Sequence, residues 1–260
     1  MEHPKEIFQS TFLTNPLPPI SVYMPAYNAE KYIDRNIDTV YGFLIENFED
    51  FELTIVDDNS DDNTNNIVKS KQLILNKLQL DHYHNGPSRR ENLAVSMLDA
   101  KFDTVFFIDS DLSPDIKELR GLMSAIVDQK FDVVIGSRYQ SKSADRSFLR
   151  RSLSTGYNKF VSSLFDSSIY DHNCGLKGFR KSCYSMIVEK IGHDIHHKRG
   201  WFWDVEVLLT ANQLGFRIKE IPVKWTESSS STFRFERELK VIPYAVNLVL
   251  SGRFKRQQVL

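Results

Sequence analysis

Short β-rich runs alternate with longer amphipathic stretches through the first half of the chain. The runs that predict strands lie at 20–24, 51–56, 79–83, 104–108 and 131–135. The stretches that predict helices lie at 30–47, 63–76, 88–100 and 119–129. Strands that alternate with helices pair in parallel, so this order predicts an α/β fold with a mostly parallel sheet. Such sheets bind ligands at the C-terminal ends of their strands, where we therefore expect the functional residues.

Polar residues that a loop does not require follow the first two predicted strands. Residues 25–28 (Pro-Ala-Tyr-Asn) follow the first, and Tyr27 offers a flat face to a nucleobase, although a turn with the ring over the core explains it as well. Residues 57–62 (Asp-Asp-Asn-Ser-Asp-Asp) follow the second. Helix capping explains the last acids of this turn. It does not explain Asp57 and Asp58, because adjacent carboxylates repel unless a ligand's donors or a cation bind them.

The strongest chemical signal is the sequence Val-Phe-Phe-Ile-Asp-Ser-Asp at 105–111. Its apolar part predicts a buried strand, and the strand ends in two carboxylates, Asp109 and Asp111, with one residue between them. Carboxylates with few other ligands nearby suit Mg²⁺ or Mn²⁺, which keep several waters and bind phosphate oxygens. The alternative is that the two acids only open the loop before the next helix.

Composition narrows the function classes. The 260 residues are 41% hydrophobic, and 33 Lys and Arg stand against 34 Asp and Glu, a formal net charge of −1. This balance predicts a globular domain and argues against a surface that binds nucleic acid, so any anion site is local. The chain has neither a Gly-rich dinucleotide fingerprint nor a phosphate-loop signature. Its two cysteines, Cys174 and Cys183, fit a reducing compartment and buried positions.

The ends of the chain suggest a division into an N-terminal extension at 1–18, one domain at 19–235 and a C-terminal helical segment at 236–260. The N-terminus has no long apolar core of a signal peptide, which indicates a cytoplasmic protein. Residues 241–250 are apolar but shorter than the roughly 20 residues that cross a bilayer. Basic residues follow them, so both a packed terminal helix and a segment lying on an anionic membrane fit.

In order along the chain, the motifs at 25–28, 56–60 and 109–111 resemble the nucleotide-sugar motifs of family 2 glycosyltransferases with the GT-A fold. The motifs that resemble polyprenyl-phosphate (dolichyl-phosphate) hexosyltransferases lie at 131–139, 171–180, 201–206 and 220–225. The resemblance covers about 20–234. It implies a single Rossmann-like domain and an inverting, metal-dependent hexosyltransferase. The implied donor is a UDP- or GDP-hexose and the implied acceptor is polyprenyl phosphate, with peripheral contact to the cytoplasmic face of the membrane.

The resemblance also implies site residues. Those expected to hold the nucleotide are Pro25, Tyr27, Asn28, Val56, Asp57, Asp58, Asp109, Ser110 and Asp111. Asp109 and Asp111 would hold Mg²⁺ or Mn²⁺. Those expected to contact the acceptor or the sugar are Arg138, Arg150, Arg151, Asp171, Lys177 and Arg234. Those expected to carry catalysis are Asp111, Arg138, Asp204 and Glu206.

The acceptor decides which of these residues matter. A sugar hydroxyl needs a general base, and Asp204 or Glu206 is the candidate. A phosphate monoester is already an anionic nucleophile and needs cations instead, in which case these two acids bind the hexose or brace Arg138 and Lys177. The basic run from Arg138 to Lys159 supplies cations, although a solvated helix face explains it too. Two roles fit Asp171: it orients the acceptor or the sugar hydroxyls, or it caps its loop.

Two other functions fit the sequence. One is a family 2 enzyme that glycosylates a hydroxyl of a glycan or glycolipid, and the other is a non-catalytic scaffold that binds sugar nucleotides. Departures from the family pattern bear on the donor. Ala29 stands before Glu30, residues 86–90 (Gly-Pro-Ser-Arg-Arg) replace a Gly-Lys-Gly turn, and Ser-Thr-Phe-Arg at 231–234 replaces a Gly-Ser-Lys element. The motifs at 171–177 and 201–206 favour a glucosyl donor carried by uridine.

Overall fold

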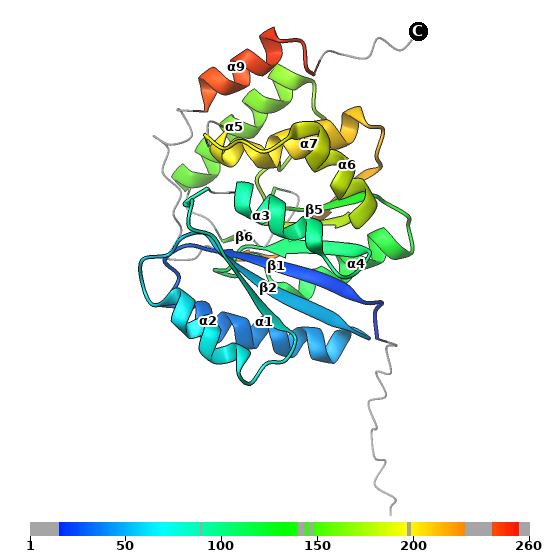
Figure 1. Cartoon of the computed structure of the whole chain (residues 1–260). Helices are drawn as coiled ribbons and strands as arrows, with labels where there is room; N and C mark the ends of the chain where they lie inside the picture. The colour runs from blue at the N-terminus through cyan, green and yellow to red at the C-terminus, as the bar shows by residue number, and fades with distance from the viewer. Residues whose placement is uncertain are drawn as a thin grey trace, which may run out of the picture.

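The computed structural model describes residues 16–88, 90–139, 144–145, 148–196, 199–226 and 241–254. Within them, seven strands form one sheet, and helices cover both of its faces (Figure 1). The strand order is β3-β2-β1-β4-β7-β5-β8. Every neighbouring pair is parallel except the two pairs that β7 makes, with β4 and β5. The predicted α/β fold with a mostly parallel sheet is confirmed.

The elements are short and closely connected. The strands of the main sheet are β1 Ile20–Ala26, β2 Phe51–Asp57, β3 Leu78–His82, β4 Thr104–Ile108, β5 Val133–Ser137, β7 Leu176–Arg180 and β8 Ile218–Pro222. A small parallel pair consists of β6 Ala144–Asp145 and β9 Trp225–Thr226. The α-helices are α1 Ile33–Asn47, α2 Thr64–Gln72, α3 Glu91–Ser96, α4 Leu119–Val127, α5 Phe148–Phe165, α6 Lys181–Ile191, α7 Trp203–Gln213 and α9 Ile242–Leu250. Short 3₁₀ turns are η1 Met97–Asp99, η2 Ile116–Glu118 and η3 Gly200–Phe202.

Each strand and helix predicted in the first half is present, but some bounds differ. The helix expected at 88–100 is α3 followed by η1, and it begins later because the Ser88 hydroxyl accepts the backbone N–H of Asn92 at 3.0 Å. The strand expected at 131–135 is β5, two residues further on. There Phe131 N–H donates to the Ala125 carbonyl, and the Asp132 carboxylate accepts from Arg217 N–H, so both residues belong to the turn.

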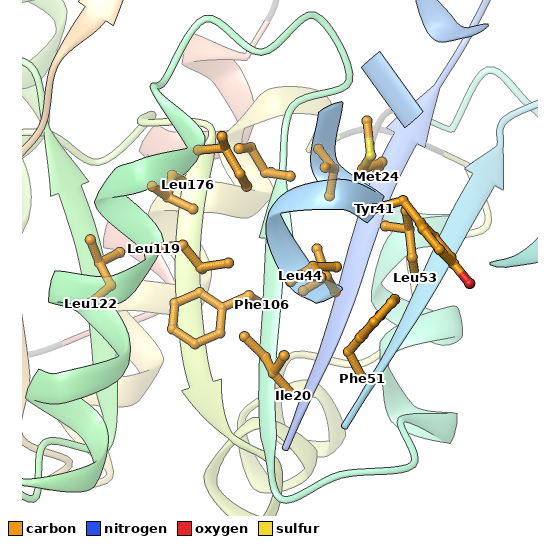
Figure 2. Close-up of a cluster of buried hydrophobic side chains, with 14 of the residues drawn as sticks. Ile20, Met24, Tyr41, Leu44, Phe51, Leu53, Phe106, Leu119, Leu122 and Leu176 are labelled. Atoms are coloured by element: carbon orange, nitrogen blue, oxygen red, sulfur yellow. The ribbon is translucent and has the colours of Figure 1, made fainter. Parts of the chain in front are cut away.

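Both faces of the sheet are buried. On β4, Phe106 packs into the core beneath α1 and α4, whereas Phe107 packs into the core on the α6 and α7 side. Figure 2 shows the first of these cores, where Phe106 lies near Leu119 and Leu176. Burial on both sides explains why the strand is a continuous apolar run rather than an alternating one. Packing on both faces therefore fixes the central strands in position, and the loops at their ends start from fixed points.

A third apolar cluster holds the C-terminal helix. Ala245 and Leu248 of α9 are buried against Phe165 of α5 and against Phe202 and Val205 at the start of α7. One face of residues 241–250 is thus packed on the domain, as one of the two sequence interpretations requires. Within the described residues, no helix combines the length and apolar character needed to cross a bilayer.

Replacing Gly178 by alanine should destabilise the fold. Gly178 lies in the middle of β7, and a Cβ added there would lie 2.2 Å from Cε1 of Phe106. Because this ring is buried between the sheet and its helices, relief requires the core to shift, at about 1–3 kcal/mol of unfolding free energy. Urea denaturation measures the change.

Gly121→Ala is the matched control. This glycine lies in α4 with nothing within 4 Å of an added Cβ, so alanine should raise the unfolding free energy by about 0.5–1 kcal/mol. A Gly178→Ala protein as stable as the wild type would contradict the close packing of β7 on Phe106.

Candidate functional site

The candidate site lies where β1, β2 and β4 end on the same edge of the sheet. The chain order reverses there, because β1 has β2 on one side and β4 on the other. Loops leaving neighbouring strands diverge at such a point, and ligands bind between them. The loop that leads into β7 reaches the same edge, since β7 runs antiparallel to β4 and pairs Leu176 with Ile108.

The loops after β1 and β2 are tied to each other. Asn28 has a positive φ of 52°, its N–H donates to the Ser60 hydroxyl at 3.0 Å, and its side-chain oxygen accepts from Asp61 N–H at 3.0 Å. Next to it, Tyr27 is 41% exposed, so its ring lies on the surface rather than over the core. Pro25 is half-buried beside it. An exposed ring on a fixed loop suits stacking on a base.

Protein groups donate to Asp57 and Asp58, so a ligand's donors are not needed to explain the two acids, and their contact with a nucleotide stays a prediction. Asp57, at the end of β2, accepts hydrogen bonds from Ser60, from Asn65 at 3.1 Å and from His82 at 2.8 Å. Both carboxylates are buried, as is Val56 before them.

Asp58 is held by the start of α3. Its Oδ1 accepts from the Ser88 hydroxyl at 2.7 Å and from Asn92 Nδ2 at 2.6 Å. Gly86 is required here, since an added Cβ would lie 2.1 Å from the carbonyl oxygen of Asp58. The two acids thus fix the loops at the end of β2.

Four alternating charges form the centre of the site. Asp109, at the end of β4, accepts from Nη2 of Arg90 at 3.0 Å. The Nε of Arg90 donates to Oδ2 of Asp204 at 3.1 Å, and Oδ1 of Asp204 accepts from Lys177 Nζ at 2.6 Å. Arg90, Lys177 and Asp204 are buried, whereas the side chain of Asp109 remains 31% exposed. The charged row therefore begins in the interior and ends at a carboxylate that solvent reaches.

Aromatic rings and a glycine fix this row in position. The Arg90 guanidinium lies between the rings of Phe107 and Trp201, at 4.8 and 5.0 Å from their centroids. The carboxylate of Asp109 lies against the backbone of Gly175, because an added Cβ there would lie 1.8 Å from Oδ2. Asp109 N–H also donates to the Gly175 carbonyl at 2.8 Å.

Asp111 differs from Asp109 in its partners. Its oxygens accept from the backbone and hydroxyl of Ser113, both at 3.0 Å, and none of the ion pairs of the described residues includes it. Burial and then the negative charge of Asp109 raise the pKa of Asp111. Ser110 between them is buried, and its carbonyl accepts from Asn36 Nδ2 at 2.8 Å.

The two acids fit a divalent cation that takes most of its ligands from elsewhere. The described residues contain no group of three or more His, Cys, Asp and Glu side chains placed to hold a metal. Two carboxylates on one turn, one of them without a cationic partner among the described ion pairs, match an ion that completes its shell with water and phosphate oxygens. Their mutual repulsion is what such a cation would relieve.

A second pair of charges lies at the end of β5. Arg138 donates from Nε to Oδ2 of Asp171 at 2.7 Å and from Nη2 to Oδ1 at 2.6 Å, and its backbone N–H donates to Oδ2 at 2.9 Å. Asp171 is buried. Burial raises the pKa of Asp171, but the interaction with Arg138 lowers it by more, so the pKa lies below its ordinary value. Of the expectation that Asp204 or Glu206 braces Arg138 and Lys177, the Lys177 part is confirmed by the bond to Asp204, whereas Arg138 is held by Asp171 instead.

Asp204 and Glu206 have separate environments although only Val205 stands between them. Although burial raises the pKa of Asp204, Lys177 and Arg90 together lower it. Glu206 is fully buried and accepts from Arg199 Nη1 at 3.3 Å and from the Tyr244 hydroxyl at 2.8 Å. It therefore belongs to the packing of α7 on α9 and is not brought into the central row.

The structure thus brings together some expected residues and leaves others apart. Asp109, Lys177 and Asp204 form the central row, with Arg138 and Asp171 as a second pair. Arg151 is exposed on α5, whereas Arg234 and the side chain of Arg150 lie outside the described residues. Sequence reasoning missed Arg90 as a site residue. The sequence signal for Arg90 was the segment 86–90, which replaces the expected Gly-Lys-Gly turn and keeps a positively charged residue there.

Comparisons with known proteins give the family and the fold. The family model described as glycosyl transferase family 2 matches residues 21–187. Glycosyltransferase AglD of Haloferax volcanii is 30% identical over 85% of this chain, which spans only 35% of AglD. The dolichyl-phosphate beta-glucosyltransferase of Dictyostelium discoideum is 30% identical over 82% of this chain and 68% of its own.

A solved structure agrees in fold. Glucosyl-3-phosphoglycerate synthase from Mycobacterium tuberculosis, in complex with Mn²⁺, UDP and glucosyl-3-phosphoglycerate, superposes with a TM-score of 0.64 over 93% of this chain and 81% of its own. The identity is 18%, so this likeness concerns the fold alone. The domain has the GT-A fold that the sequence motifs implied.

Lys177→Met should be strongly destabilising. The substitution keeps the length of the side chain but leaves Asp204 buried with Arg90 as its remaining cation, and breaking a buried ion pair costs about 3–5 kcal/mol. Denaturant unfolding at pH 7 measures the loss.

Lys101→Met is the control for the same change at the surface. Lys101 is 58% exposed and pairs with Asp50 at 3.1 Å, so its loss should change the unfolding free energy by less than about 1 kcal/mol. If the unfolding free energy of both variants falls by the same small amount, the bond between Lys177 and Asp204 is not required for the stability of the fold.

Proposed function

The chain belongs to glycosyl transferase family 2, and we propose that it transfers a hexose from a nucleoside diphosphate sugar to polyprenyl phosphate with inversion at the anomeric carbon. That it is a glycosyltransferase follows from the family. The acceptor is supported by relatives named dolichyl-phosphate beta-glucosyltransferase, from Dictyostelium discoideum and Saccharomyces cerevisiae among others. A β-linked product from an α-linked donor requires inversion. The proposed donor is UDP-glucose, with GDP-hexoses as the alternative.

The observation that carries the acceptor assignment is the state of Asp204. A hydroxyl acceptor needs a base that takes its proton, and Asp204 and Glu206 are the carboxylates that the sequence offers. Asp204 is buried between two cations that lower its pKa, which makes it a poor base. Glu206 is buried in contact with Arg199 and Tyr244. An acceptor that arrives as an anion needs neither, so the site favours a phosphate over a hydroxyl.

Arg138 is the residue proposed to bind the acceptor phosphate. A guanidinium has five N–H donors, and Asp171 takes two of them, from Nε and Nη2. The others are directed away from Asp171. A guanidinium that is already held in one orientation loses little side-chain freedom when it binds an oxyanion. Trp225, at 4.9 Å from the guanidinium to the ring centroid, covers one face of it.

The proposed reaction is a direct displacement. An oxygen of the lipid phosphate forms a bond to the anomeric carbon on the face opposite the diphosphate, and the bond from that carbon to the diphosphate oxygen breaks, with its electron pair leaving on the diphosphate. Asp109 and Asp111 would hold Mg²⁺ or Mn²⁺, which when bound offsets the charge of the leaving group. Arg90 and Gly175 hold Asp109 in place for this role. Tyr27 stacks on the base.

The exposed face of α9 is proposed to contact the membrane. Ile242, Val246, Val249 and Leu250 recur at the spacing of one helix face, and each is at least 38% exposed. The opposite face is packed on the domain. The sequence continues with Lys255 and Arg256, which suit anionic lipid headgroups. The contact suits an acceptor that is itself anchored in lipid, and we propose that it lies on the cytoplasmic face of the membrane.

Transfer of label to lipid tests the function. The protein is incubated with UDP-[¹⁴C]glucose or GDP-[¹⁴C]mannose, Mn²⁺ or Mg²⁺, and polyprenyl phosphate in detergent, and the product is extracted into organic solvent. We expect label in the lipid phase from UDP-glucose. Asp111→Asn should lower the rate at least about 100-fold, because the charge that stabilises the leaving diphosphate is lost.

Asp128→Asn is the control, since Asp128 lies beyond α4 and its carboxylate accepts from Ser124. It should retain the wild-type rate. If no donor delivers label to the lipid, the acceptor assignment is wrong. Full transfer in the presence of EDTA would contradict the proposed metal.

Sedimentation with vesicles tests the membrane contact. The full chain should bind vesicles of phosphatidylcholine with 30% phosphatidylglycerol, and Val246→Asp with Val249→Asp should weaken binding at least about tenfold, because each change places a charge on the apolar face.

The matched control is Ile74→Asp, at a 77% exposed apolar residue in the loop after α2. It should bind as the wild type does. Equal losses in both proteins, or wild-type binding by the α9 variant, would show that α9 is not the membrane face.

A further inference from the structure

Glu220 is a titratable residue that the proposed reaction leaves without a role. It lies on β8, the strand next to β5, and is paired in register with Ile135, three residues before Arg138. Its carboxylate accepts two backbone N–H groups in succession, from Tyr170 to Oε2 at 2.9 Å and from Asp171 to Oε1 at 2.8 Å. One side chain of an edge strand therefore holds the turn that carries Asp171.

Asp171 in turn holds Arg138 by three donors. Two of them belong to the guanidinium and the third is the backbone N–H of Arg138 itself, at 2.9 Å. Because the backbone and the side chain of the same arginine bond one carboxylate, the direction of the fork is fixed relative to the end of β5. The contacts run in one line, from Glu220 through the backbone of the turn to Asp171 and then to Arg138.

Packing alone does not explain this line of contacts, although Ile169 and His172 on either side of it are buried. Tyr170 is 65% exposed, so its side chain does not anchor the turn in a core. Glu220 also stands close to a second carboxylate, and burial, followed in smaller part by the charge of Asp171, raises its pKa. Two neighbouring carboxylates in a partly buried place are unfavourable unless each is needed as an acceptor. Here each one accepts hydrogen bonds that orient the next group.

We propose that Glu220 is a positioning residue for the acceptor, which holds the 170–171 turn so that Asp171 presents the Arg138 fork to the phosphate of the incoming lipid. The inference rests on the proposed function for the identity of the acceptor. It assigns to Glu220 an effect on acceptor binding and none on the nucleotide, whose proposed contacts come from β1, β2 and β4.

The test compares Michaelis constants for the two substrates in the full-length enzyme. Glu220→Gln keeps the size of the side chain but places an amide NH₂ against one of the two N–H donors. We expect the KM for polyprenyl phosphate to rise about tenfold, as for the loss of one hydrogen bond to a charged group. The KM for UDP-glucose should stay at the wild-type value.

Asp132→Asn serves as the matched control. Asp132 Oδ2 accepts the N–H of Arg217 at 2.9 Å, so it is also a carboxylate that holds backbone beside β8, but just before the strand begins rather than at the 170–171 turn. This variant should leave both Michaelis constants unchanged. Unchanged constants in Glu220→Gln, or an equal rise in both, would overturn the inference, because either result excludes a specific effect on the acceptor.

Hydrogen exchange keeps the inference testable without an acceptor. In Glu220→Gln the amides of Tyr170 and Asp171 should exchange about tenfold faster than in the wild type, while the amides of β1 and β2 remain protected. Wild-type exchange rates at the turn would overturn the positioning role. If the wild-type enzyme transfers no sugar to polyprenyl phosphate, the proposed function fails separately, and the exchange data still decide what Glu220 holds.

Discussion

The carboxylate of Asp204 bonded to two buried cations is the interaction on which the site depends. Arg90 comes from the start of α3, Lys177 from β7 and Asp204 from α7, so two helices on one face of the sheet and one of its strands meet at this acid. Hydrophobic residues of similar volume would often stabilise such a place at least as well, because desolvating charges is unfavourable. What apolar packing does not provide is a directed N–H group for Asp109. Arg90 provides this N–H group. Because Arg90 is itself fixed in the interior, it also fixes the carboxylate of Asp109 at the surface.

Asp204 and Glu206, which only Val205 separates in the sequence, have different partners in the structure. Residues two apart on a helix point about 200° apart, so Asp204 and Glu206 face different neighbours. Asp204 faces the strand ends, and Glu206 faces Arg199 and the C-terminal helix. A pair of carboxylates with one residue between them on a loop, such as Asp109 and Asp111, has no such constraint, and the two can approach one ion. Spacing alone therefore does not distinguish a metal site from two structural ion pairs, whereas the local backbone does.

The order of elements and the binding edge could be predicted from the sequence because they depend on local patterns. The apolar run before Asp109 can only be a buried strand, and its end must lie at the functional edge. Apart from the pair of Asp204 and Lys177, which the family resemblance suggested, the partners of the charged residues could not be predicted, since they come from distant segments. Arg90 and Asp204 are 114 residues apart in the chain, and Asp57 and Asp58 find part of their protein donors in the distant residues His82 and Asn92. Adjacent acids indicated a ligand because their protein partners were not visible in the sequence.

The turn that leads into β7 connects the two halves of the proposed reaction. Asp171 at its start fixes Arg138, Gly175 contacts the carboxylate of Asp109, and Lys177 at its end bonds Asp204. Three residues within the seven-residue segment 171–177 thus contact the proposed acceptor cation, the proposed metal ligand and Asp204. Because β7 runs antiparallel to both of its neighbours, β4 and β5, its N-terminal end lies at the edge where the parallel strands have their C-terminal ends. A parallel strand in this position would begin at the opposite edge, and its preceding turn would not reach the site. The reversal of this strand is therefore what places the proposed donor and acceptor contacts on one short segment, at a fixed separation.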